Sequence, residues 1–583
     1  MAMRLHTRLR YAPAEVRVEK RADGTQLLRS PQPLGGHARA VGDWLVQWYE
    51  RAPERTFIAE RKGDGWRRVS YRDALSDARR IGQALLNLGL DASRPVAILS
   101  DNGVEHALLA LGAMHAGVPV APISPAYSLM SKDFAKLKAI FELLRPGLVF
   151  AAEPEKFAPA LAAVGAVSTP VAKLLETNPG SSLELAFSRL QPDTVAKILF
   201  TSGSTGAPKG VLNTHRMLCA NQQMLAQVWP FLEDRAQTLV DWLPWNHTFG
   251  GNFCFNLVLR NGGTLYVDGG KPAPALVETT VRNLREVSPT LYFNVPRGFD
   301  LLLPYLEKDA ALRRNFFSNL DMLFYAGAAL PQNLWERLEA LAIAEKQGEL
   351  AMLSSWGSTE TAPSAAAVHY PIERAGVIGL PNPGCELKLV PAAGKLEVRV
   401  KGPHVTPGYL RRPDLTAEAF DEEGYYRIGD AMRFADPAAP EKGLVFDGRV
   451  AEDFKLGTGT WVHVGALRVK LIAAGNPLIQ DAVLTGHDRN EVGALLFLSP
   501  AAKDLSAEAL RERLAAALRS LAAEGGSSTH PRRALVLAEP PSIDAGEITD
   551  KGYVNQRAVL ERRAALVELL YADPPSAEVL GVK

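Results

Sequence analysis

One segment constrains the fold of this chain more than any other: the run from Leu199 to Val211, which reads Leu-Phe-Thr-Ser-Gly-Ser-Thr-Gly-Ala-Pro-Lys-Gly-Val. The residues at its start, Val195 to Phe200, have the β-branched and aromatic content of a short buried strand. An amphipathic segment starts after Asn213 and Thr214, which are favourable N-cap residues. Glycines between two such elements let successive backbone N–H groups turn toward one anion. The segment therefore predicts a phosphate-binding loop.

Hydroxyl groups and one lysine add donors and charge to this predicted loop. Its spacing differs from G-x-x-x-x-G-K-[ST], because Pro208 stands where the glycine before the lysine should be, and this disfavours a P-loop NTPase. A flexible Ser/Gly linker is the alternative, but linkers rarely end in Pro-Lys-Gly between a strand and a helix. We expect phosphate contacts from Thr201, Ser202, Gly203, Ser204, Thr205, Gly206 and Lys209.

Length and composition limit the class of protein. A chain of 583 residues exceeds what one core usually supports, so we expect two or more domains. Since 65 Lys and Arg residues balance 64 Asp and Glu residues, we expect no nucleic-acid partner bound by bulk charge. The three cysteines are widely spaced and fit a reducing compartment without structural zinc or disulfides. The first residues carry no apolar leader core and no apolar run approaches a membrane span, so we expect a cytoplasmic protein without a membrane partner.

The order of sequence patterns predicts an α/β protein. Amphipathic segments at 71–90 and 105–116 alternate with strand-like runs at 95–99 and 118–122, which favours layered sheets and helices. Short strand-like runs gather later, at 395–401 and 443–447, between Gly and Pro turns. Beyond Gly448 we expect a second unit, with a surface helix at 505–524 and a long helical stretch at 553–571.

Three further motifs follow the phosphate-binding segment in the chain. They are Trp356-Gly357-Ser358-Thr359-Glu360, Tyr426-Arg427-Ile428-Gly429-Asp430 and a segment that begins at Gly448-Arg449. Together with the first segment they resemble, in order, the signature motifs of the adenylate-forming superfamily. That superfamily contains acyl-CoA synthetases, aryl-CoA ligases, peptide-synthetase adenylation domains and luciferases.

The resemblance implies a fold and a set of ligands. The fold is α/β, with a large N-terminal adenylating domain of layered α/β sheets and a small β-rich subdomain over residues 1–448. A smaller, mobile α+β C-terminal domain follows over residues 449–583. The implied ligands are ATP, Mg²⁺, coenzyme A and a small carboxylic acid, and a homodimer remains open.

The resemblance also assigns the nucleotide contacts. Glu360 supplies a carboxylate oxygen to Mg²⁺, a hard cation that binds few carboxylates together with phosphates, and Thr205 and Glu360 serve catalysis. Trp356, Gly357 and Thr359 face the adenine and phosphates, and Asp430 and Arg449 reach the ribose or α-phosphate. Taken alone, Trp356 would more often be a core residue, Asp430 a structural turn residue and Glu360 a solvated one.

The implied acid pocket comes from segments that follow the nucleotide motifs. His247 occupies a position beside the substrate carboxylate, and its catalytic role is weighed evenly against that of a packed core histidine. Aromatic and small residues together suggest a slot for a planar ring, although this composition does not exclude a fatty chain. The expected lining is Trp245, His247, Phe249, Asn252, Val295, Tyr325, Ala326, Gly327 and Ala328.

The C-terminal unit is expected to supply a catalytic cation. The candidate is Lys551, although the usual family pattern places the lysine directly after the glycine, where this chain has Glu547. The alternative is a surface lysine before a helix. The hinge also differs, with Ala451 in place of the common Asp or Lys, and Lys455 and Gly457 resemble the segment that lines the pantetheine tunnel.

Two stretches narrow the resemblance. Residues 446–462 and 546–573 resemble bacterial feruloyl-CoA synthetases, which implies a ligase for ferulate or related hydroxycinnamates and a role in aromatic acid degradation. The same-class alternative is a medium- or long-chain fatty acyl-CoA synthetase. From other classes come a luciferase-like oxygenase and a non-catalytic nucleotide-binding protein. A carboxylic acid reductase is disfavoured in this interpretation, because the given sequence carries no phosphopantetheine or reductase segment.

Overall fold

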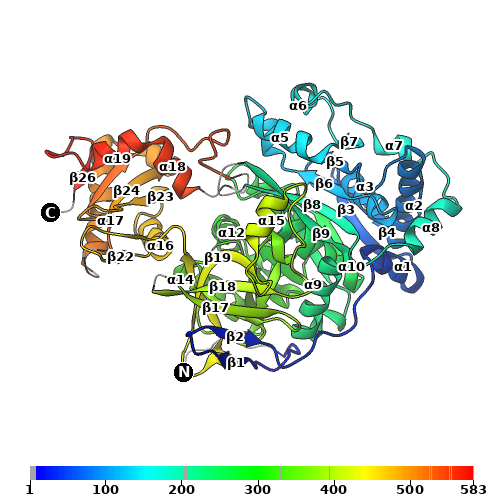
Figure 1. Cartoon of the computed structure of the whole chain (residues 1–583), viewed down its shortest axis with the longest axis horizontal. Helices are drawn as coiled ribbons and strands as arrows, with labels where there is room; N and C mark the ends of the chain where they lie inside the picture. The colour runs from blue at the N-terminus through cyan, green and yellow to red at the C-terminus, as the bar shows by residue number, and fades with distance from the viewer. Residues whose placement is uncertain are drawn as a thin grey trace.

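The computed structural model describes residues 8–202, 207–328, 330–392, 394–523, 526, 528–549, 552 and 554–581. Figure 1 shows a larger body, coloured blue to yellow along the chain, and a smaller lobe in orange and red that ends at the C-terminus. Sheets and helices alternate in both parts, which confirms the expected α/β class with a large N-terminal and a smaller C-terminal region. The exact boundary at 448/449 stays a prediction.

A five-stranded sheet carries the segment that opened the sequence analysis. Its order is β7-β5-β6-β8-β9, with the first four strands parallel and β9 antiparallel to β8. The strands are β5 (Val96–Leu99), β6 (Val120–Ile123), β7 (Leu148–Ala151), β8 (Val195–Ser202) and β9 (Pro208–Thr214).

Helix α2 shows how sequence dictates local structure beside this sheet. Ser70 caps the helix by accepting the N–H of Asp73, and apolar residues at helical spacing bury one face against α3. The helices of the larger body are α1 (Val41–Arg51), α2 (Tyr71–Asn87), α3 (Val104–His115), α4 (Ala126–Leu129), α5 (Ala135–Leu144), α6 (Ala158–Ala163), α7 (Val171–Leu174), α8 (Ser181–Ser188), α9 (His215–Val228), α10 (Phe255–Asn261), α11 (Val277–Glu286), α12 (Pro296–Lys308), α13 (Ala310–Ser318), α14 (Gln332–Lys346) and α15 (Pro413–Ala419).

A second and a third sheet complete the larger body. The four-stranded sheet has the order β10-β11-β3-β4 and consists of β3 (Thr56–Lys62), β4 (Gly65–Ser70), β10 (Thr238–Asp241) and β11 (Thr264–Val267). The eleven-stranded sheet has the order β1-β2-β17-β18-β19-β20-β16-β15-β14-β13-β12. Its strands are β1 (Arg17–Lys20), β2 (Gln26–Arg29), β12 (Leu291–Asn294), β13 (Met322–Tyr325), β14 (Ala351–Gly357), β15 (Ser364–Ala367), β16 (Val377–Pro381), β17 (Glu386–Ala392), β18 (Lys395–Lys401), β19 (Tyr426–Phe434) and β20 (Leu444–Arg449).

Tight helical turns join several of these elements. A π-helix, η2 (Phe249–Cys254), leads directly into α10, and the 3-10 turns are η1 (Pro230–Glu233), η3 (Thr359–Thr361) and η4 (Pro440–Lys442). Single π-turns are rare and occur mostly at functional sites.

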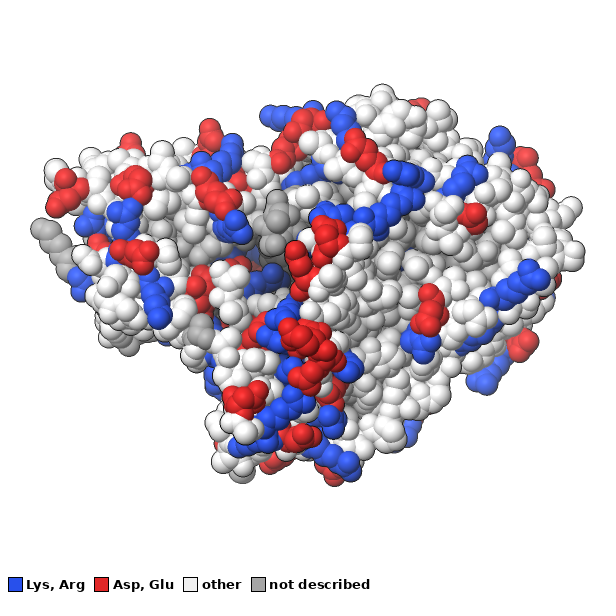
Figure 2. Space-filling model, viewed as in Figure 1, with Lys and Arg blue, Asp and Glu red and all other residues white. Residues whose placement is uncertain are grey.

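The smaller lobe has its own buried core beneath a four-stranded sheet of order β23-β24-β25-β26. Its strands and helices are β21 (Phe454–Lys455), β22 (Trp461–Val462), α16 (Val464–Ala474), β23 (Ile479–Thr485), β24 (Gly493–Leu498), η5 (Pro500–Asp504), α17 (Ala507–Ala522), β25 (Arg533–Val536), α18 (Gln556–Arg562), α19 (Ala564–Leu570) and β26 (Leu580–Gly581). Figure 2 shows a recess between this lobe and the larger body, with Lys, Arg, Asp and Glu interspersed on the visible face.

Two expectations need correction. The long helix expected at 553–571 is two short helices, because Arg563 between them turns its guanidinium into the lobe and donates to Glu547 and to the carbonyls of Glu539 and Pro540. The segment after β8, expected to lead to a helix, leads to a second strand instead: residues 208–214 form β9, antiparallel to β8, before Thr214 caps α9.

Candidate functional site

The predicted phosphate-binding loop lies at the turn of the β8–β9 hairpin. Residues 203–206, and with them Gly203, Ser204, Thr205 and Gly206, lie outside the described residues, as does the side chain of Ser202. Thr201 and Lys209 are opposite each other in the hairpin register. The ammonium of Lys209 lies 5.4 Å from the centre of the Tyr409 ring, and the residue is one register pair from the end at which β8 and β9 are connected.

Tyr409 connects this lysine to the carboxylate expected to bind Mg²⁺. Its hydroxyl donates to Glu360 Oε1 at 3.2 Å and lies 3.3 Å from the hydroxyl of Tyr426. Glu360 is buried in turn η3, at the end of the second motif. One carboxylate near the segment predicted to bind phosphate fits the preference of Mg²⁺, which usually binds one or two carboxylates together with phosphate oxygens.

A second cluster unites three residues from the later motifs. The indole N–H of Trp356 donates to Asp430 Oδ2 at 2.9 Å, and Arg449 Nε lies 3.5 Å from Asp430 Oδ1. Asp430 and Arg449 are register partners on β19 and β20. Asp430 is 6% exposed, and its Oδ1 accepts no hydrogen bond from the described residues. Burial raises the pKa of Asp430, and the Arg449 guanidinium opposes that rise. A hydroxyl donor would complete this carboxylate.

The topology explains why distant motifs meet here. Strands β12, β13 and β14 are parallel, so Val295, Ala326 and Gly357 all lie at their carboxyl ends, on one edge of the sheet. Ligands of open α/β sheets bind at that edge. Only glycine fits at 357, because a Cβ there would lie 1.7 Å from the Pro363 carbonyl oxygen. Gly327 and Ala328, just after β13, are exposed, and Thr359 begins η3.

The expected acid-binding segment enters the site through the π-helix η2. His247 precedes it, and its Nδ1 accepts the N–H of Phe249 at 3.3 Å. The Phe249 ring packs edge-on or tilted against Phe253, Phe293 and Phe324, with ring centres 5.7 to 6.4 Å apart. Asn252 is fully buried and donates to Asn213 Oδ1 at 2.9 Å and to Thr248 Oγ1 at 3.1 Å. These four rings are at most 5% exposed and belong to one buried cluster, so contact of Phe249 with an acid stays a prediction.

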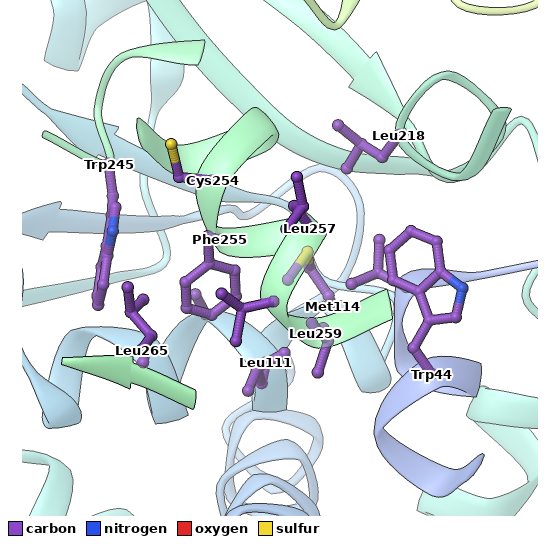
Figure 3. Packing of buried hydrophobic residues seen from close by; sticks show 14 of the residues in the cluster. Trp44, Leu111, Met114, Leu218, Trp245, Cys254, Phe255, Leu257, Leu259 and Leu265 are labelled. Atoms are coloured by element: carbon purple, nitrogen blue, oxygen red, sulfur yellow. The ribbon is translucent and has the colours of Figure 1, made fainter. Parts of the chain in front are cut away.

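Two residues expected in the acid pocket are packed in the cores. Trp245 is 4% exposed, with its ring 5.0 Å from His106 and 5.1 Å from Phe255, and Figure 3 shows it among the buried side chains. Tyr325 is also 4% exposed, packs edge-on against Trp335 and accepts the Gly376 N–H through its hydroxyl oxygen. Their burial is accounted for by packing alone, and contact with an acid stays a prediction for both.

A buried carboxyl group lies a few residues before the segment 247–254. Asp241 ends β10 and accepts the N–H of Leu243 at 3.2 Å. Burial, with repulsion from Asp268, raises the pKa of Asp241 to about 8, so the carboxyl group is protonated at neutral pH. The folded chain therefore holds a proton that the unfolded chain releases above about pH 4.

This protonation predicts a pH dependence of stability. As pH rises from about 4 to about 8, the Asp241 contribution becomes less favourable by at most about 1.4 kcal/mol per pH unit. Asp241→Asn keeps a neutral group and should remove that slope. Melting curves from pH 6 to pH 8 should show the wild-type melting temperature falling relative to that of the variant. Parallel curves would contradict this assignment.

The C-terminal lobe contacts the larger body near the β8–β9 hairpin. Lys136 on α5 donates through Nζ to the Ile543 carbonyl at 2.5 Å, and the Lys132 N–H donates to Asp544 at 3.1 Å. Ile543 packs against the core cluster that contains Phe200 of β8. Lys551 lies outside the described residues, but the segment eight residues before it is fixed against the larger body.

Glu547 occupies the position where the family pattern has lysine. Its side chain is fully buried, and its carboxylate accepts hydrogen bonds from Arg562 at 2.6 Å and from Arg563 at 2.7 Å. The residue is therefore a structural anchor within the lobe, and a cation at this sequence position would face two arginines.

Buried charges also join the two regions at the predicted hinge. Lys395 on β18 forms an ion pair with Asp453, and both side chains are at most 5% exposed. Asp453 Oδ1 accepts the Val464 N–H at the start of α16, at 3.0 Å, and His463 Nδ1 lies 3.0 Å from Oδ2. The pair thus connects the larger body to the first helix of the lobe.

The segment expected to line the pantetheine tunnel contacts residues of the C-terminal lobe. Lys455 is exposed on β21, with its ammonium 5.0 Å from the Trp461 ring, and the Gly457 N–H donates to the Arg489 carbonyl at 2.8 Å. Each described contact lies within the lobe, and a role with coenzyme A stays a prediction.

Sequence reasoning missed several residues of the site. Tyr409, Lys395 and the rings of Phe253, Phe293 and Phe324 act through contacts between distant segments, which no local pattern reveals. Lys197 did carry a signal, because a charged residue inside the apolar run 195–200 contradicts a simple buried strand.

The described residues contain neither a membrane-spanning helix nor a cluster of potential metal ligands. None of the helices in the described ranges combines the length and apolar content required to cross a bilayer. Within the same ranges, His, Cys, Asp and Glu side chains do not gather in groups of three or more that would hold a metal ion.

Family models match both regions of the chain. One described as "AMP-binding enzyme" matches residues 45–410, and one described as "AMP-binding enzyme C-terminal domain" matches residues 464–574. The first covers the β8–β9 hairpin, residues 247–254 and the turn η3 with Glu360. The second starts at the first residue of α16.

Curated proteins and solved structures show further similarity. A carboxylic acid reductase of Segniliparus rugosus is 26% identical over 418 residues, 65% of this chain, and the match spans only 33% of that protein. The long-chain-fatty-acid–CoA ligase ACSBG1 of Rattus norvegicus is 26% identical over 82% of this chain and 73% of its own. Two solved structures share the fold: ATP-bound MatB from Rhodopseudomonas palustris (21% identity, TM-score 0.68, 90% of this chain and 99% of that one) and the anthranilate CoA ligase AuaEII with anthranoyl-AMP (19%, 0.71, 92% and 98%).

Proposed function

Because the chain belongs to the AMP-binding enzyme family, we propose that it is an ATP-dependent acid–CoA ligase acting on aryl acids, with ferulate and related 4-hydroxycinnamates as its substrates. Adenylate-forming CoA ligases use ATP, Mg²⁺ and coenzyme A. The proposal extends this ligand set to the present chain.

One observation carries the proposal, namely the buried Asp430 carboxylate, one oxygen of which lies 3.5 Å from Arg449 but accepts no hydrogen bond from the described residues. Asp430 Oδ1 accepts no hydrogen bond from the described residues, while Oδ2 is fixed by the Trp356 indole. A ribose hydroxyl would satisfy that oxygen, and Trp356 would lie beside the base. On the phosphate side, Lys209 and Glu360 are connected through Tyr409 and supply one cation and one carboxylate.

The proposed reaction has two steps. The acid carboxylate attacks the α-phosphorus of ATP, the bond to the β-phosphate oxygen breaks, and pyrophosphate leaves with the electron pair. The coenzyme A thiolate then attacks the acyl carbon, and AMP leaves. Lys209 and the hairpin would hold the phosphates, Glu360 would hold Mg²⁺, which neutralises phosphate charge, and His247 would orient the acid. Lys551 would face the charge that grows as pyrophosphate departs.

Aromatic side chains support an aryl acid. The rings of Phe249, Phe253, Phe293 and Phe324 lie in or against the segment 247–254, where the acid is expected, and stacked or edge-on rings favour a planar partner. The anthranilate CoA ligase shows that this fold can accommodate a small aromatic acid. A fatty acyl-CoA ligase is the second candidate, because the similar rat protein is a long-chain-fatty-acid–CoA ligase aligned over 82% of this chain.

A substrate panel tests the proposal. Ferulate, p-coumarate, caffeate, benzoate and octanoate are each incubated with ATP, Mg²⁺ and coenzyme A, and AMP release is measured. We expect ferulate and p-coumarate to exceed octanoate in kcat/KM by several-fold, since one favourable ring contact contributes about 1 kcal/mol. A larger kcat/KM for octanoate would contradict the aryl assignment. AMP release independent of every acid would contradict the ligase itself.

A further inference from the structure

Two residues of the β8–β9 hairpin form hydrogen bonds with the π-helix η2, which lies in the segment expected to bind the acid. Lys197 on β8 and Asn213 on β9 are register partners in the sheet. Lys197 Nζ donates to the Gly251 carbonyl at 2.6 Å, and Asn213 Oδ1 accepts from Asn252 Nδ2 at 2.9 Å. Two consecutive residues of η2 are therefore bound by two facing residues of the hairpin whose turn is the predicted phosphate loop.

Lys197 is an unusual residue for this place. It is 4% exposed, and it forms no ion pair with a carboxylate in the described part of the chain. Its other near neighbours are the Phe255 ring, 5.5 Å from Nζ, and the imidazoles of His106 and His215, whose pKa values burial lowers to about 4. Burial also lowers the pKa of Lys197 to about 7. Because burying an unpaired ammonium is unfavourable, packing alone does not explain a lysine here.

The π-helix is held on its remaining sides by close contact. A Cβ at Gly250 would lie 2.2 Å from the Leu243 carbonyl oxygen, and one at Gly251 would lie 2.3 Å from that of Trp245. Gln222 on α9 donates to the carbonyls of Asn252 and Phe253, both at 3.2 Å. Because its backbone is packed so closely, η2 should shift as one rigid unit when its contacts with Lys197 and Asn213 change. His247 and Phe249 move with it, since they lie at its start.

We propose that Lys197 and Asn213 are positioning residues that set the acid-binding segment 247–254 at a fixed distance from the phosphate loop. This inference deepens the proposed function and rests on it. Two hydrogen bonds then connect the segment that binds the ATP phosphates directly to the segment that binds the acid. Neither side chain contacts a reactant in this arrangement, and both act through the π-helix backbone and Asn252.

The variant Lys197→Met tests the proposal, because methionine fills a similar volume and lacks the donor. We expect the KM for the acid to rise about tenfold, the effect of losing one hydrogen bond from a charged donor, while the KM for ATP changes less than twofold. Asn213→Leu should produce a similar split. The double variant should show less than the product of the two effects, because both residues hold the same segment.

Lys388→Met is the matched control. Lys388 is also a buried lysine, but it pairs with Asp421 and Glu423 in the sheet region around β17. Its removal should lower the melting temperature and leave the KM for the acid unchanged. Equal rises in the KM for the acid in Lys197→Met and Lys388→Met would overturn the proposal, because they would reflect general destabilisation.

Hydrogen exchange without substrates separates this inference from the proposed function. Amides of residues 249–256 should exchange faster in Lys197→Met than in the wild type, while those of β5 and β6 should not. If exchange rises and the wild type activates no acid, the link between the hairpin and the π-helix stands and the ligase proposal fails. If the wild type activates an acid, but the variant changes neither its KM nor the exchange of 249–256, the inference is wrong and the ligase proposal stands.

Discussion

Lys551→Ala should slow adenylate formation by about 10² to 10³, the scale expected for the loss of one preorganised electrostatic group. A cation directed at the α-phosphate stabilises charge that develops only as pyrophosphate leaves, so it affects the transition state more than bound ATP. Thioester formation from chemically prepared feruloyl-AMP and coenzyme A should stay near the wild-type rate. Single-turnover measurement of each half-reaction provides the comparison.

An exposed lysine of the same lobe supplies the control. Lys503 lies in turn η5, and Lys503→Ala should leave both half-reactions unchanged. Equal damage to both steps in a folded Lys551→Ala variant would show that the residue is structural. Loss of neither step would show that another cation serves the reaction.

Asp430→Ala should raise the KM for ATP by about ten- to a hundredfold. Hydrogen bonds to a charged acceptor contribute about 1.5 to 3 kcal/mol each, and the net loss of ATP binding is smaller than their sum because water can replace part of the lost contacts. The measurement is the initial rate against ATP concentration at saturating acid.

The variant Asp430→Asn separates binding from structure. An asparagine oxygen can still accept the Trp356 N–H, so the local fold is retained while the charge is lost. We expect a smaller rise in the KM for ATP than in the alanine variant, with the melting temperature close to the wild-type value. A KM for ATP unchanged in both folded variants would remove Asp430 from the ribose role.

Elements with strong local signals were predictable from the sequence. The segment 71–90 gave α2 within a few residues, the run 395–401 gave β18, and Thr214 is the N-cap of α9. Each depends on periodicity or capping, which are properties of neighbouring residues. The four motifs were also readable, because each is a short contiguous run.

Features that depend on distant contacts were not predictable. The break between α18 and α19 needs the carboxylate of Glu547 to hold Arg563, and no helical pattern shows this. Trp245 and Tyr325 satisfy the composition of an aromatic pocket, but their partners His106 and Trp335 draw them into the cores. Tyr409 connects Lys209 to Glu360 from a segment outside all four motifs.

The Lys395–Asp453 ion pair affects which relative orientations of the larger body and the C-terminal lobe are favourable. Its hydrogen bonds are directional, and its Coulomb attraction weakens as the charges separate and water enters, so a rotation that withdraws Asp453 from β18 loses the hydrogen bonds first and then much of the attraction. Such a rotation also leaves the nearly buried Lys395 ammonium to the carbonyl and, at 3.9 Å, the carboxylate of Asp447, and losing the Asp453 charge is costly until water reaches the site. Intermediate angles therefore have the cost of separation without the gain of new contacts. A joint of this kind favours a few discrete orientations of the C-terminal lobe over a continuous range. The fraction of molecules in the orientation seen here then depends on the charge at residue 453.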